Sequence, residues 1–179
     1  MAQGLAQNAS SSDLNPVGPG VAEFRHALGH FATGITVITT LTDDGELHGL
    51  TANSVTSVSL TPPLILFCIK NTARSLAVLQ RRRAFSLHIL TEDQERIAMG
   101  FASNVDRASI CDWSKTARGL PLLSSFHIAL ECTIEEIYPG GDHAIVLARV
   151  SEIHRGNEEA GPLLFYKGKV VSMRGTHNS

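Results

Sequence analysis

Six short hydroxyl and amide side chains are concentrated between residues 51 and 59, directly before a strongly apolar segment over residues 64–69. They are Thr51, Asn53, Ser54, Thr56, Ser57 and Ser59. A plain barrel strand does not need so many donors and acceptors, whereas a binding surface does, and short side chains let a flat ligand approach the backbone closely. The segment therefore predicts one wall of a binding site. The alternative is a solvent-facing strand, because hydroxyl and β-branched residues also suit pleated surfaces.

Other reactive side chains have simpler explanations. His26 and His30 lie four apart on an expected helix, but two histidines underfill a zinc shell, so we expect no metal site there. Cys111 has no activating base close in sequence. The basic run 81–83 suits the negative end of a helix dipole without any ligand. Motifs for phosphate loops, zinc proteases and serine hydrolases are absent from the sequence, so phosphoryl transfer and hydrolysis lose their main support.

Composition sets limits on the class of protein. The 179 residues are 43% hydrophobic and 18% charged, which is enough to bury a core, and we expect a single domain over residues 21–175 after a disordered lead-in over residues 1–20. A net charge of −2 gives no general attraction to nucleic acid or to an anionic membrane. The three cysteines contain no CxxC pair, which favours a reducing cytoplasm.

Apolar periodicity and turn residues give the elements that must position the polar segment. We expect helices over residues 21–31, 73–83 and 92–102, the second of them capped by Thr72. We expect strands over residues 35–41, 47–54, 64–69, 84–90, 129–138, 142–153, 163–166 and 169–173. Hairpins predominate and strands do not alternate regularly with helices, so the sequence predicts a mainly β protein, a closed antiparallel barrel with a few covering helices.

Five ordered motifs resemble the flavin reductase-like family, the small reductase components of two-component flavin-dependent monooxygenases. They are Thr33-Gly-Ile-Thr-Val-Ile-Thr39, Gly49-Leu-Thr-Ala-Asn-Ser54, Ser57-Val-Ser-Leu-Thr-Pro-Pro63, Thr72-Ala-Arg-Ser75 and Gly141-Asp-His143. The resemblance covers residues 24–173. It implies a split, Greek-key barrel that binds FAD or FMN, generally as a homodimer with the flavin sites near the subunit interface.

The resemblance also implies a set of cofactor-binding positions. These are Thr33, Gly34, Thr36, Thr51, Ala52, Asn53, Ser54, Ser57, Val58, Ser59, Cys68, Arg74, Ser75, Phe101 and His143. Within the set, the backbone and side chains of residues 51–54 can meet the polar edge of an isoalloxazine ring. Ser57 and Ser59 are candidates for the ribityl chain or the phosphate. Arg74 and Ser75 begin a helix, where backbone donors, the helix dipole and a guanidinium all favour a phosphate.

The Gly141-Asp142-His143 turn is associated in this family with nicotinamide binding. His143 would position the nicotinamide beside the flavin without transferring a proton, since the two cofactors carry the hydride chemistry themselves. The implied activity is hydride transfer from NADH, or from NADPH, to FAD or FMN, followed by release of reduced flavin to a separate monooxygenase. The alternatives are a noncatalytic flavin-binding barrel and a split-barrel oxidase that retains FMN.

Overall fold

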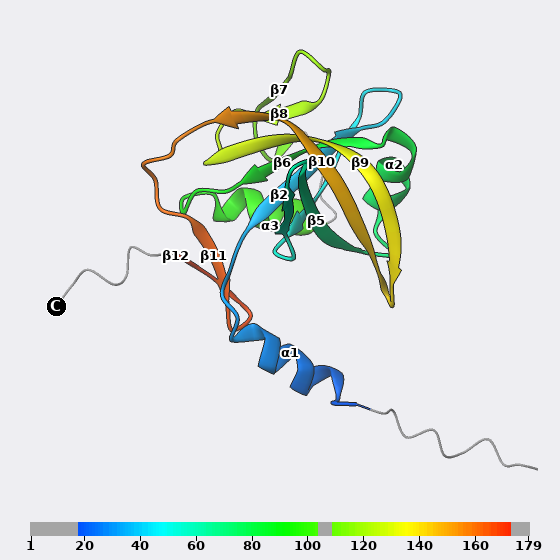
Figure 1. Ribbon diagram of the computed structural model, residues 1–179. Coiled ribbons are helices and arrows are strands. Elements are labelled where there is room, and N and C mark those ends of the chain that lie inside the picture. The colour runs from blue at the N-terminus through cyan, green and yellow to red at the C-terminus, as the bar shows by residue number, and fades with distance from the viewer. Residues whose placement is uncertain (1–17, 104–108, 173–179) are drawn as a thin grey trace, which may run out of the picture.

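A seven-stranded antiparallel sheet forms the body of the protein in a computed structural model, which describes residues 18–103 and 109–172 (Figure 1). Its strands are β2 (Thr36–Leu41), β3 (Leu47–Ala52), β4 (Thr56–Leu60), β5 (Pro63–Lys70), β6 (Ala84–Ile89), β9 (Ile128–Gly140) and β10 (His143–Arg155). Their spatial order is β3-β2-β6-β9-β10-β5-β4. The expected lead-in over residues 1–20 lies almost wholly outside the described residues.

One serine links the end of the edge strand β3 to β5, near the other edge of the sheet. Ser54, two residues after β3, donates its hydroxyl hydrogen to the Cys68 carbonyl of β5 at 3.2 Å and accepts the Cys68 N–H at 3.0 Å. A side chain thus replaces the ladder of backbone bonds that would otherwise join the two strands, and it brings β3 beside β5. The mainly β, antiparallel barrel predicted from the sequence is confirmed.

Two smaller sheets flank the barrel. The first has the order β1-β11-β12 and consists of β1 (Thr33–Gly34), β11 (Leu163–Tyr166) and β12 (Lys169–Ser172). The strands expected over residues 163–166 and 169–173 are joined by a turn at Lys167-Gly168, where both residues have positive φ, 50° and 78°. This last hairpin pairs with β1 and does not join the seven-stranded sheet. The second sheet is the short hairpin of β7 (Trp113–Lys115) and β8 (Pro121–Leu123).

Two of the three helices that the described residues form pack on the barrel. Helix α2 (Arg74–Arg82) buries Leu76 and Leu79, and α3 (Glu95–Ala102) buries Ala98 and Phe101. Helix α1 (Val21–Gly29) buries no residue and extends away from the barrel (Figure 1). The expectation that the helices cover the barrel therefore holds for α2 and α3 only. No helix among the described residues combines the length and the hydrophobicity that crossing a membrane would require.

Two predicted helix starts were wrong. Thr72 does not cap α2: the N-cap residue is Ala73, and no side chain bonds to the first turn. Helix α3 begins at Glu95 and not at residue 92, because side chains hold the preceding residues in a turn. The Gln94 amide oxygen accepts the Thr91 N–H at 2.9 Å, and the Thr91 hydroxyl donates to Asp93 at 2.6 Å. Such local bonds compete with helical backbone bonds.

Strand β6 lies between β2 and β9, and both of its faces are buried. Phe85, Leu87 and Ile89 share one face, as the alternation predicted, and the first two are 0% exposed. On the opposite face His88 is also fully buried. The Leu123 N–H donates to His88 Nε2 at 3.2 Å, so Nδ1 carries the hydrogen and donates to the Val37 carbonyl at 3.1 Å. Burial lowers the pKa of His88 to about 4, which keeps the ring neutral at pH 7.

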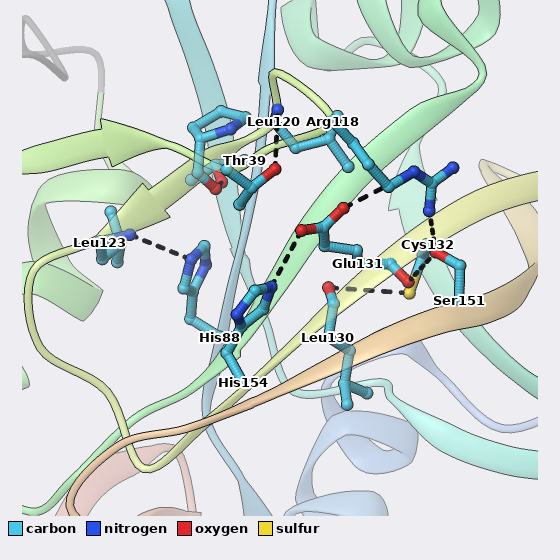
Figure 2. A network of polar contacts seen from close by, with 12 residues as sticks. Thr39, His88, Arg118, Leu120, Leu123, Leu130, Glu131, Cys132, Ser151 and His154 are labelled. Carbon is cyan, nitrogen blue, oxygen red and sulfur yellow. Dashed lines mark hydrogen bonds and ion pairs between the residues drawn. The ribbon is translucent and has the colours of Figure 1, made fainter.

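A buried carboxylate on β9 lies on the same face of the sheet as this histidine (Figure 2). Glu131 is 0% exposed, with His154 Nε2 2.9 Å from its Oε1 atom and Arg118 Nε 3.7 Å from its Oε2 atom. The ligand atoms of Glu131, Glu152 and His154 lie within 4.8 Å of one another, a spacing that a metal ion can use. However, Arg118 forms an ion pair with Glu131 and His154 lies within hydrogen-bond distance of the same carboxylate, so we assign the cluster a structural role.

Candidate functional site

An open cavity of about 730 Å³ lies where the end of β3 meets the end of β5 and the start of α2. The end of α3 and the first residue of β10 complete its wall. Nine of the predicted site residues line it. They are Thr51, Ala52, Asn53, Ser54, Cys68, Arg74, Ser75, Phe101 and His143. Segments that are up to 94 positions apart in the sequence, from Gly49 to His143, thus contribute to one concave surface, which we call the main cavity.

Several hydroxyl groups of the predicted wall are engaged within the protein. The Thr51 hydroxyl donates to the Ala98 carbonyl at 2.5 Å, which ties β3 to α3. The Ser54 hydroxyl bonds to Cys68, and the Ser75 hydroxyl donates to the Gly49 carbonyl at 2.9 Å. These side chains therefore shape the wall. Asn53 and Ser54 are exposed, and among the described residues the Asn53 amide bonds to Thr33 at 3.3 Å, so the backbone and the amide at this end of β3 are left to meet a ligand.

The floor of the main cavity depends on close packing between Gly49 and Phe101. A Cβ atom at position 49 would lie 2.8 Å from two carbons of the Phe101 ring and 2.7 Å from the Ile38 carbonyl oxygen. Phe101 is 2% exposed, so its ring has little room to move. The absence of a side chain at Gly49 is what lets α3 approach β3 this closely. The ring of Phe101 consequently forms part of the cavity wall.

One end of the main cavity is suited to an anion. Arg74 is exposed and is the first residue of α2, whose N-cap residue Ala73 provides no side-chain bond. The N–H groups of Arg74 and Ser75 donate to no acceptor among the described residues, and the Arg74 guanidinium forms no ion pair there. Free N–H groups, the positive end of a helix dipole and a guanidinium together favour a phosphate.

The mouth of the main cavity carries the Gly141-Asp142-His143 turn. Gly141 has φ 75°, which favours glycine, and the turn leads into β10. His143 Nδ1 donates to Asp142 Oδ1 at 2.8 Å, and this bond holds the pKa of Asp142 below its usual value. The bond also fixes the ring, so that Nε2 remains for a ligand.

Six predicted site residues do not line the main cavity. Thr36 is buried and donates to the Ala52 carbonyl at 2.8 Å, so it supports the wall from behind. Thr33 and Gly34 pair with β11, and Thr33 lines a second groove described below. Ser57, Val58 and Ser59 lie on β4, the edge strand of the sheet. In a single chain the structure does not bring these six residues to the main cavity.

Sequence reasoning missed one charged residue of the main cavity. Lys70 is the last residue of β5, is exposed, and lines the main cavity beside His143. The only sequence signal was a cation directly after an apolar strand, which is common at the end of any strand. The position of Lys70 beside His143 follows from the register of β5 and β10, which pairs these two residues. That pairing joins residues 73 positions apart, so it was not visible in the sequence.

A second groove, of about 850 Å³, continues from the main cavity and runs along α1. We call it the α1 groove. Asn53, Ser54 and Lys70 line both hollows. The helix contributes Phe24 and Leu28, each 55% exposed, and Phe31 follows it at 73%. Exposed apolar side chains at this density are typical of a surface that binds another protein chain.

Comparison with known proteins identifies the family. Residues 28–174 match the model of the flavin reductase like domain. The chain is 40% identical over 151 residues to the reductase subunit HsaB of a flavin-dependent monooxygenase from Rhodococcus jostii, covering 84% of this chain and 76% of that protein. It is 37% identical over 154 residues to an NADH-dependent flavin reductase from a Rhodococcus species, covering 83% and 84%.

A solved structure agrees with this assignment. The NADH:FAD oxidoreductase SgcE6 of Streptomyces globisporus, determined in complex with NAD and FAD fragments, superposes with a TM-score of 0.80 at 35% identity, covering 88% of this chain and 94% of that one. The family match covers every motif quoted above. The fold and the arrangement of the main cavity support the same assignment. The chain belongs to the flavin reductase-like family.

Proposed function

We propose that this protein is an NADH-dependent flavin reductase that transfers hydride to FAD or FMN. The observation that carries the proposal is the main cavity itself. It brings together a guanidinium at a helix start, a histidine whose ring is fixed by Asp142, and the exposed end of β3 at Asn53 and Ser54. A flavin presents a flat polar ring and an anionic tail, and this combination fits such a cavity. Membership of the family supports the same activity.

Each part of the main cavity then has a role. The exposed backbone of Asn53 and Ser54 and the Asn53 side chain bind the polar edge of the isoalloxazine ring. Arg74 and the N–H groups that begin α2 bind the flavin phosphate. His143 orients the nicotinamide over the ring through Nε2. Holding the two reacting atoms about 3 to 3.5 Å apart supplies most of the rate advantage, because the cofactors carry the chemistry.

We propose that two copies of the chain associate through the α1 groove. Helix α1 has no buried residue in the single chain, so its apolar face is left for a second copy to cover. The α1 groove is continuous with the main cavity, and a second copy bound there would lie beside the flavin. Thr33 lines the α1 groove and would then lie at the edge of the flavin site. Ser57, Val58 and Ser59 lie on β4, and they would also lie at that edge if the partner chain extended over β4.

The proposal includes release of reduced flavin to a separate monooxygenase. The main cavity is open to solvent at one side, and several of its hydroxyl groups are already engaged within the protein, which favours moderate affinity. A dissociation constant near 1 μM corresponds to a binding free energy of only about −8 kcal/mol.

We place the protein in the cytoplasm, because the three cysteines are free thiols and NADH is the expected donor.

The direct test mixes the purified protein with NADH and excess FAD or FMN and follows absorbance at 340 nm. We expect oxidation of NADH that requires added flavin, and reduced flavin that a separate oxygenase can use. If the protein binds flavin but does not oxidise NADH, it is a noncatalytic flavin-binding barrel. If it purifies yellow and consumes oxygen with a small substrate in the absence of NADH, it is an oxidase.

A further inference from the structure

Lys70 is held beside the nicotinamide-associated turn by the surrounding backbone. In the β5–β10 register, Lys70 is directly opposite His143, so the two side chains lie on the same face of the sheet. The next residue fixes this arrangement: the Asn71 N–H donates to the Asp142 carbonyl at 3.0 Å, and the Asn71 amide donates to the Gly141 carbonyl at 3.0 Å. The end of β5 and the turn therefore behave as one unit.

The Lys70 ammonium is available to a ligand. Lys70 is exposed, and among the described residues no carboxylate lies within ion-pair distance of its Nζ atom. Asp142 is the nearby acid, but its carboxylate bonds to His143. Of the described cationic residues that line the main cavity or the α1 groove, Lys70 alone lines both.

The two free cations of the main cavity lie on different elements. Arg74 begins α2, four residues after Lys70, while Lys70 is on the sheet next to the turn that carries His143. A flavin and a nicotinamide dinucleotide each bring a phosphate group of their own. One cation at each place matches two anionic ligands that must be bound at the same time.

We propose that Lys70 binds the pyrophosphate of the nicotinamide dinucleotide while Arg74 binds the flavin phosphate. This inference rests on the proposed function and assigns a second anionic subsite to it. Because Lys70 lines the main cavity opposite His143, a dinucleotide whose pyrophosphate is held at Lys70 can place its nicotinamide at His143. Lys70 is thus a positioning residue that determines affinity for the hydride donor and leaves affinity for flavin unchanged.

The test compares Lys70→Gln and Lys70→Arg with the wild-type protein, and uses Lys115→Gln as a control because Lys115 is exposed on β7 and lines neither hollow. We expect Lys70→Gln to raise the KM for NADH about tenfold, the effect of losing one charged contact. The Kd for flavin and kcat should stay within about twofold, which is below the effect of losing a charged contact. Lys70→Arg should restore most of the affinity.

Two further measurements separate this role from others. N-Benzyl-1,4-dihydronicotinamide donates hydride but has no phosphate, so Lys70→Gln should leave its rate unchanged. Calorimetric titration of the flavin-loaded protein with NAD⁺ reads dinucleotide binding without turnover, and Lys70→Gln should weaken that binding by the same tenfold factor.

Other outcomes overturn the inference. An equal loss with NADH and with the phosphate-free donor would show that Lys70 acts on the nicotinamide or on the fold. A weaker Kd for flavin would assign Lys70 to the flavin phosphate, and unchanged NADH kinetics and NAD⁺ binding would leave it without a role. If the wild type binds NAD⁺ in a Lys70-dependent way but does not reduce flavin, the proposed function fails while the subsite stands.

Discussion

Replacing Gly49 with alanine tests whether the floor of the main cavity depends on the approach of Phe101 to β3. The new methyl group would lie 2.7 Å from the Ile38 carbonyl oxygen and 2.8 Å from the Phe101 ring. Neither neighbour can move easily, since one is backbone of a central strand and the other is 2% exposed. Overfilling a packed site typically costs about 1–3 kcal/mol, and three contacts below 3.0 Å place this change at about 2 kcal/mol.

The assay for this prediction is chemical and thermal unfolding, followed by titration with flavin. A loss of about 2 kcal/mol should lower Tm by about 4–8 °C in a domain of this size. Displacing the ring should also weaken flavin binding. Gly34→Ala is the matched control, because nothing lies within 4 Å of a Cβ atom there.

Adding Phe101→Leu to Gly49→Ala should recover part of the stability, because the smaller side chain relieves the ring contact and leaves the contact with Ile38. A Gly49→Ala protein as stable as the Gly34→Ala control, with normal flavin affinity, would refute the reasoning.

Three further changes have definite expected outcomes. Arg74→Ala should raise the Kd for FMN or FAD about tenfold, and it should not change the Kd for riboflavin, which lacks the phosphate. Equal weakening of all three flavins in a fluorescence titration would contradict the phosphate role. The pKa of His88 is lowered to about 4 in the folded protein from 6.5, so its contribution to stability is complete above pH 6.5 and is lost as pH falls toward 4. The free energy of unfolding should therefore drop by about 2 kcal/mol between pH 7 and pH 5 on account of this residue, and His88→Asn should show a smaller drop; identical pH profiles in denaturant titrations would exclude this explanation. Phe24→Asp should convert a dimer into monomers in sedimentation experiments, whereas Ile153→Asp, at a residue 59% exposed on β10, should not; a wild-type monomer would rule out the α1 interface.

Most of the fold was predictable because local patterns determine strands and turns. The alternation in β6, the turn at Asp43-Asp44-Gly45 and the long β9–β10 hairpin each depend on residues that are close in sequence. The starts of α2 and α3 were wrong for a local reason as well. Thr72 makes no capping bond, and the side chains of Thr91 and Gln94 hold a turn where periodicity alone continued the helix.

The buried polar groups were outside the reach of sequence patterns. The alternation of residues in β9 does not reveal that the face carrying Glu131 is buried. Its partners Arg118 and His154 come from other segments. His88 looks like any histidine in a strand until Leu123 and Val37 are found on its two ring nitrogens. Whether such a residue is charged depends on burial and on partners that only packing supplies.

The sequence by itself determined the family and pointed to residues 49–54, Arg74 and the turn at His143 as its ligand-binding motifs. The order and spacing of short motifs can be recognised without any knowledge of the contacts that their residues make. The tertiary structure decided which atoms face the ligand. It directs the hydroxyl groups of Thr51, Ser54 and Ser75 into the protein and places Lys70 opposite His143. The physical reason is that hydrogen-bond partners and strand register are long-range properties of the barrel, which a linear pattern does not contain.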